Sequence, residues 1–166
     1  MKIMLLMVLC SVAGTAFAAP PKEAISPYQK WLDEDVTYII TAGERAAFKR
    51  LSTDAERKDF IEQFWLLRDP TPGTAENEFK DEHYRRIAYA NEHFGAQAPG
   101  WKTDRGRIYI VFGPPDEIED QSSSVNWTYR YLEGIGSNVK IHFVDRAGSG
   151  EFQMLIDPNN PLGSGN

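Results

Sequence analysis

Apolar residues recur every three or four positions in the first half of this chain and alternate with polar residues in the second half. The first spacing predicts amphipathic helices, and the second predicts strands with one buried face. The helical pattern covers about residues 27–94 and is strongest at 54–67 and 74–94, where the apolar stripe is wide enough to face a core. From about 107 to 156, the alternation and the intervening glycines predict strands joined by turns.

Threonines mark the expected helix starts. Thr41 is followed three residues later by Glu44, and Thr53 by Glu56. At this spacing the two side chains can each cap a backbone N–H group of the first helical turn. Thr74 is the expected cap of the last and longest helix.

The order of the elements predicts the fold class. Helices come before strands, which favours an α+β fold: an N-terminal helical layer packed on a C-terminal antiparallel β-sheet. Neither part is expected to hold a sufficient core alone, so we expect a single domain over residues 27–156. The predicted strands are 107–112, 125–132, 138–145 and 151–156.

The first residues resemble a cleaved secretory signal. Lys2 precedes an apolar run from Ile3 to Ala13, and Ala16-Phe17-Ala18 offers small residues for cleavage, which gives a signal peptide over residues 1–18. The run is shorter than the roughly 20 apolar residues of a membrane-spanning helix, although an N-terminal anchor is the alternative. We expect export to the periplasm or the extracellular space, and no transmembrane segment in the mature chain. The chain would continue with an extended lead-in at 19–26 and end in a flexible tail at 157–166.

Composition narrows the chemistry. The single cysteine of the 166 residues, Cys10, lies inside the predicted signal, so thiol catalysis, disulfides and cysteine-bound zinc are excluded for the mature chain. The 18 Lys and Arg against 24 Asp and Glu leave a net charge of −6, which argues against a nucleic-acid partner bound through bulk positive charge. We expect no cofactor.

The most distinctive stretch is Gly-Trp-Lys-Thr-Asp at residues 100–104, continued by an apolar run and Gly113-Pro114-Pro115-Asp116. Together with upstream residues, it resembles the GWxTD domain family, which is named for the pentapeptide. The resemblance covers about residues 28–120. It implies an exported bacterial protein or domain, and it implies no particular activity, cofactor or catalytic residue. The upstream match comprises Phe64-Trp65, Arg68-Asp69-Pro70, Asn77-Glu78, Arg86, Ala90-Asn91 and Phe94.

The motif residues suit a structural role. Gly100 allows unusual backbone geometry, and Trp101 can bury a large ring where helices give way to strands. Thr103 and Asp104 can bond nearby N–H groups; the functional alternative makes Asp104 a base or metal ligand. Upstream, the Arg68-Asp69 pair ends a helix, where Arg68 can meet the helix's own carbonyls, pair with an acid such as Asp104, or bind an anion.

The strand predicted at 125–132 carries three aromatic residues, and their role has two interpretations. Trp127, Tyr129 and Tyr131 are two residues apart and share one face of a strand. That face is core if the helices cover it, and an interaction surface if they do not.

The function expected from these signals is a non-catalytic protein-interaction or structural module of the cell envelope, whose partner is an envelope or secreted protein. The alternative is a secreted hydrolase or metal-dependent enzyme that uses acidic residues with His83 or His142. His83 falls on the apolar face of its predicted helix, which favours a structural histidine. The acidic run at 116–120 could hold calcium, but a solvated sheet edge that repels strand pairing is the simpler interpretation.

Overall fold

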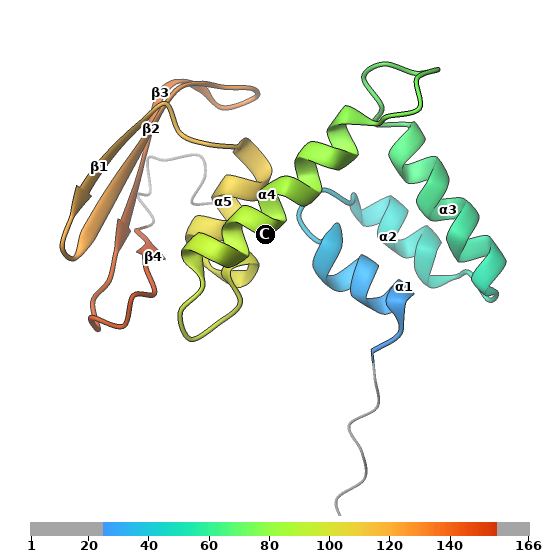
Figure 1. The fold of residues 1–166 in the computed structure, drawn as a ribbon, viewed down its shortest axis with the longest axis horizontal. Helices are drawn as coiled ribbons and strands as arrows, with labels where there is room; N and C mark the ends of the chain where they lie inside the picture. The colour runs from blue at the N-terminus through green and yellow to red at the C-terminus, as the bar shows by residue number, and fades with distance from the viewer. Residues whose placement is uncertain (1–24, 156–166) are drawn as a thin grey trace, which may run out of the picture.

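The computed structural model describes residues 25–155. In this range five α-helices precede a four-stranded antiparallel sheet (Figure 1), which confirms the α+β fold class. The predicted signal peptide at 1–18, most of the lead-in at 19–26 and the predicted tail at 157–166 lie outside the described residues.

The N-terminal helices begin where the threonine signals predict. Thr41 and Thr53 each form a complete capping box with the glutamate three residues later, Glu44 and Glu56 respectively. These signals are local, so neighbouring residues alone are enough to position both helix starts. In chain order, the elements are α1 (Pro27–Lys30), a π-helical turn η1 (Trp31–Asp35), α2 (Ala42–Lys49) and α3 (Asp54–Leu66).

Helix α4 (Glu78–Phe94) is the longest, and it starts later than predicted. Asn77, not Thr74, is its cap: the Asn77 Oδ1 atom accepts the N–H of Lys80 at 2.9 Å. The Asn77 amide also donates to the carbonyl of Trp65 at 2.8 Å. One side chain therefore starts α4 and holds it against the end of α3.

The strand predicted at 107–112 is wrong. These residues belong to helix α5 (Asp104–Phe112), which follows a short 3-10 turn, η2 (Gly100–Lys102). Ile108 and Ile110 are both buried although they are two positions apart. A helix buried on several sides loses the one-sided pattern that separates helix from strand in a short apolar run.

The sheet has the order β1-β2-β3-β4, and all its pairings are antiparallel. Its first strand, β1, lies in the acidic run and is exposed throughout at the edge of the sheet. The sequence predicted a solvated sheet edge in this run but not the bounds of a strand. On the inner face, Val125 and Trp127 of one strand lie opposite Phe143 and Ile141 of the next. The strands are β1 (Glu117–Gln121), β2 (Ser124–Leu132), β3 (Gly136–Val144) and β4 (Gln153–Met154).

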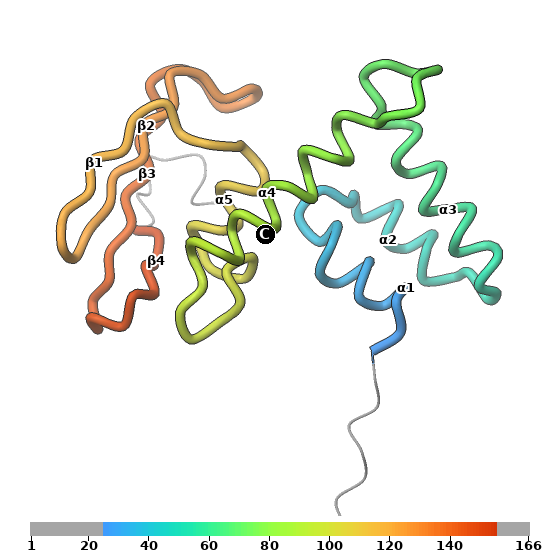
Figure 2. Tube along the Cα trace, in the orientation of Figure 1, coloured from blue at the N-terminus to red at the C-terminus, as the bar shows by residue number. Residues whose placement is uncertain are grey.

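The buried residues form two clusters instead of one. Helix α5 and the second half of α4 cover the sheet, whereas α1, α2 and α3 lie on the other side of α4 (Figures 1 and 2). The helical part therefore contributes a cluster of buried residues separate from that of the sheet. This helical core consists of Trp31, Leu32, Val36, Phe48, Phe64 and Trp65. The sheet core consists of Ala90, Phe94, Ile108, Ile110, Val125, Trp127, Tyr129, Leu132, Ile141 and Phe143.

Candidate functional site at the junction of the two cores

Two glycines bring the motif segment into direct backbone contact with its neighbours. A Cβ atom on Gly100 would lie 1.8 Å from the carbonyl oxygen of Ala90 in α4, and one on Gly106 would lie 1.9 Å from the carbonyl oxygen of Gly100. Only glycine fits at either position without a shift of the backbone. The requirement for Gly106 is not visible in its neighbouring residues, because the contact that requires it joins η2 to α5.

Trp101 and Thr103 hold the motif in place. The Thr103 hydroxyl donates to the carbonyl of Gly100 at 2.8 Å and accepts the N–H of Gly106 at 3.1 Å, which caps α5. The N–H of Trp101 donates to Asn91 Oδ1 at 3.0 Å, and the Tyr38 hydroxyl donates to the carbonyl of Trp101 at 3.0 Å. Because Tyr38 lies between η1 and α2 in the N-terminal part, the motif links that part to the sheet part.

Asp104 binds backbone, not Arg68. Its Oδ2 atom accepts the N–H of Met154 in β4 at 2.7 Å, and its Oδ1 atom lies 3.8 Å from the guanidinium of Arg107. The carboxylate therefore connects the first turn of α5 to the last strand. Within the described range, no group of three histidine, aspartate or glutamate side chains could hold a metal ion, at Asp104 or elsewhere.

Arg68 and Asp69 end α3. Arg68 pairs with both carboxylate oxygens of Glu44 at 2.9 Å and donates to the carbonyl of Phe64, in the last turn of α3, at 3.1 Å. Desolvation works against the Glu44 charge, but hydrogen bonds from Thr41 and Arg68 hold the pKa of Glu44 below its ordinary value. Asp69 accepts the N–H of Thr71 at 2.9 Å in the turn that follows.

A cleft of about 340 Å³ lies where the two cores meet, and it is the candidate functional site. It is formed by the end of α3, the first half of α4, the end of α5 and the segment after η1. Phe79 and Val111 are 38% and 37% exposed. We call it the junction cleft; it is lined by Ile39, Arg68, Pro70, Glu78, Phe79, Glu82, His83, Arg86, Ile110 and Val111.

Arg86 crosses the junction cleft from α4 to α5. Its Nε atom donates to Glu82 at 2.8 Å, and its Nη1 atom reaches the carbonyl of Ile110 at 3.4 Å. The hydrogen bond from Arg86 is the main reason that the pKa of Glu82 is below its ordinary value. Gly113, at a φ of +82°, leaves room for the guanidinium, since a Cβ there would lie 2.9 Å from Arg86 Nη2.

His83 is buried and engaged with the helical part. Its Nε2 atom lies 2.6 Å from the carbonyl oxygen of Asp35. A carbonyl can only accept, so Nε2 carries the hydrogen and Nδ1 is the unprotonated nitrogen of the neutral ring. Desolvation lowers the pKa of His83, which favours that neutral form. The ring thus joins α4 to η1.

His142 lies on the outer face of the sheet, away from His83. Its Nδ1 atom bonds to Asn126, whose amide donates to Glu119 at 3.2 Å. The acidic run is divided between the two faces of β1, and Asp116 forms an ion pair with Arg130 at 2.6 Å. The acids therefore do not converge on one point.

The aromatic strand face is not an interaction surface at Trp127 and Tyr129. Both are 2% exposed because α4 and α5 cover them, and the Tyr129 hydroxyl donates to the carbonyl of Gly113 at 3.0 Å. Tyr131 is 65% exposed, since it lies close to the turn between β2 and β3.

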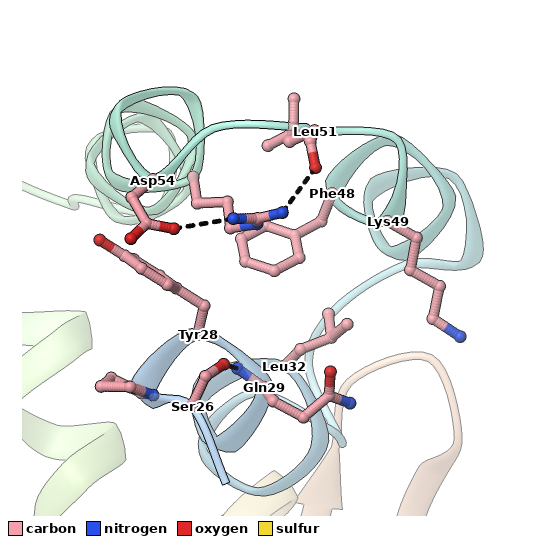
Figure 3. Close-up of a pocket in the computed structure, with 10 residues that line it drawn as sticks. Ser26, Tyr28, Gln29, Leu32, Phe48, Lys49, Leu51 and Asp54 are labelled. Atoms are coloured by element: carbon pink, nitrogen blue, oxygen red, sulfur yellow. Dashed lines mark hydrogen bonds and ion pairs between the residues drawn. The ribbon is translucent and has the colours of Figure 1, made fainter.

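A second cavity, of about 370 Å³, lies within the helical part (Figure 3). Leu32 and Phe48 line it together with Tyr28, and Arg57 is held by Asp54 at 2.8 Å and by the carbonyl of Leu51 at 2.9 Å. Unlike the junction cleft, this cavity involves only one of the two cores.

The fold and the motif together define a helical module joined to a small antiparallel sheet through the Gly-Trp-Lys-Thr-Asp turn. The chain belongs to the GWxTD domain family, since the family model described as GWxTD domain matches residues 24–154. The search of curated proteins and the search of solved structures found no match. Among the described helices, each is too short or too polar to cross a membrane.

Proposed function

We propose that this chain is an exported, non-catalytic protein-interaction module of the bacterial cell envelope, and that its partner binds in the junction cleft. The observation that carries the proposal is the exposure of Phe79 and Val111 beside an apolar cavity. Exposed apolar side chains around a concave site are typical of surfaces that bind another molecule.

The polar groups of the cleft support binding more than catalysis. Arg68 and Arg86 are each paired with a glutamate, and the Nε2–H of His83 is used by the carbonyl of Asp35. These contacts hold the walls of the cleft in place. The alternative, a hydrolase or metal-dependent enzyme built on His83 or His142 with acidic residues, has weaker support. His83 bonds to a backbone carbonyl and His142 bonds to Asn126. The glutamates bound to Arg68 and Arg86 are engaged in ion pairs.

Export is the second part of the proposal, and it is supported by the signal-like residues 1–18. We expect the protein recovered from the envelope or the medium to begin at Ala19, as measured by the mass of the intact chain. A cytoplasmic protein that retains Met1 would contradict export.

Binding in the cleft can be tested by photo-cross-linking in cells. A photoreactive residue at Val111 should give a discrete adduct with another protein. The matched control is the same residue at Ile118, which is 58% exposed at the edge of the sheet. Identical adducts from both positions, or none from Val111, would contradict a partner in the junction cleft.

A further inference from the structure

Glu78 differs from the other charged residues of the junction cleft. Arg68, Glu82 and Arg86 all take part in ion pairs, whereas no ion pair involves Glu78 within residues 25–155. Glu78 is exposed and is the first residue of α4, where the helix dipole favours a carboxylate. Its charge is therefore available to a partner without the loss of an internal contact.

The arginines of the cleft are less available to a partner. Arg68 is bound at 2.9 Å by both oxygens of Glu44, and its guanidinium lies 3.7 Å from the centre of the Phe64 ring. Arg86 is bound by Glu82. An anionic partner would have to compete with these charge-assisted bonds.

The end of α5 adds negative potential on the same side. Ile110 and Val111 lie in its last turn and line the cleft, and Arg86 reaches their carbonyls only at 3.4 and 3.5 Å. Bonds of this length are weak, so the carbonyl end of the helix dipole is only partly compensated. Both Glu78 and this helix end favour a cation.

The remaining lining is apolar and small. Its volume of about 340 Å³ is near the lower end of the roughly 300–1,000 Å³ of ligand pockets. Room for one or two side chains suits the tip of a protein segment better than a large cofactor. The apolar residues are Ile39, Pro70, Phe79, Ile110 and Val111.

We infer that the junction cleft binds a protein segment that presents an apolar side chain next to a lysine or arginine. The apolar side chain enters the cleft and the cation pairs with Glu78. This inference rests on the proposed binding role of the cleft and specifies the chemistry of its partner.

A displayed library of random heptapeptides, selected on the immobilised purified chain, tests this chemistry. We expect the unmodified protein to enrich peptides with an apolar residue beside Lys or Arg. The selected peptides should bind Glu78→Lys about 3- to 10-fold more weakly, as expected when an exposed ion pair becomes a repulsion. The same library selected on Glu78→Lys should lose the preference for basic residues.

Glu62→Lys is the matched control, because Glu62 is exposed on α3 and lies outside the junction cleft. It makes the same change of charge and should bind the peptides like the unmodified protein. Enrichment without basic residues, no enrichment, or equal weakening by Glu62→Lys would overturn the inference. Cross-linking at Val111 assumes nothing about charge, so a Val111 adduct with such a library result would leave the proposed function standing.

Discussion

At the scale of single residues, Gly100 and Gly106 matter because neither position has room for a side chain. Gly100 lies on the backbone of Ala90, and Gly106 lies on the carbonyl of Gly100. These contacts set the distances between α4, η2 and α5, and therefore the shape of the joint between the two cores.

Gly100→Ala and Gly106→Ala should each lower the free energy of unfolding, because the added methyl would overlap a backbone carbonyl. Overpacking typically costs about 1–3 kcal/mol, and a clash with backbone can cost more. The measurement is urea denaturation. Gly43→Ala is the control: nothing lies within 4 Å of its added Cβ, and alanine in a helix should raise stability by about 0.4–1 kcal/mol. A Gly100→Ala protein as stable as the original would disprove the packing argument.

His83 should make stability depend on pH. Burial lowers its pKa in the folded chain below the ordinary value of about 6.5. As the pH falls through 6.5, the unfolded chain takes up the proton first, so stability is fully present above this pH and decreases below it. We expect the melting temperature to fall between pH 7.5 and 5.5.

His83→Gln should flatten that dependence, even if it lowers the melting temperature at pH 7.5. His93→Gln is the control, since the His93 side chain is 44% exposed, and it should keep the original slope. If His83→Gln and the original protein lost stability in parallel, the buried histidine would not be the cause.

At the scale of elements, the sequence predicted correctly the features that depend on neighbouring residues. It did not predict the features that depend on contacts between distant segments. The capping boxes at Thr41 and Thr53 need only residues three positions apart, and both were confirmed. Residues 107–112 carry strand-forming side chains, yet packing between α4 and the sheet makes them helical. In the same way, Asn77 replaced Thr74 as the cap of α4 because it also bonds to the end of α3.

Asp104→Asn should loosen β4 without unfolding the sheet. The carboxylate accepts the N–H of Met154, and a hydrogen bond to a charged group contributes about 1.5–3 kcal/mol. We expect faster amide hydrogen exchange at Met154 and a modestly lower melting temperature. Arg107→Ala, which removes only the ion pair at 3.8 Å, should leave exchange at Met154 unchanged. Equal exchange at Met154 in all three proteins would show that Asp104 does not hold β4 in place.

At the scale of the whole molecule, the order of elements predicted the fold class but not the two cores. Apolar periodicity shows which face of a helix is buried, but not what buries it. Helix α4 illustrates this, because Tyr84 packs on the helical core while Ala90 and Phe94 belong to the sheet core. The junction cleft was missed for the same reason, since its lining comes from four separate segments.

The two cores are held together by α4 and by contacts across the joint. The Tyr38 hydroxyl bonds to the carbonyl of Trp101, and the rings of these two residues lie 6.2 Å apart. A continuous helix that belongs to both cores should transmit the loss of one to the other. We therefore expect the chain to unfold in a single transition.

Ala88→Pro should split this single unfolding transition into two, one for each core. Ala88 is exposed in the interior of α4, so proline there breaks the helix, at about 3 kcal/mol, without filling either core. Hydrogen exchange at increasing urea would follow α3 and β2 separately. In the original protein, the amides of α3 and β2 should become exposed to exchange at the same urea concentration, and in Ala88→Pro at different concentrations.

Ala88→Gly is the control. It costs only about 1 kcal/mol and keeps the helix continuous, so it should lower the urea concentration of exposure equally for α3 and β2. Two transitions in the original protein, or one in Ala88→Pro, would mean that α4 does not couple the cores.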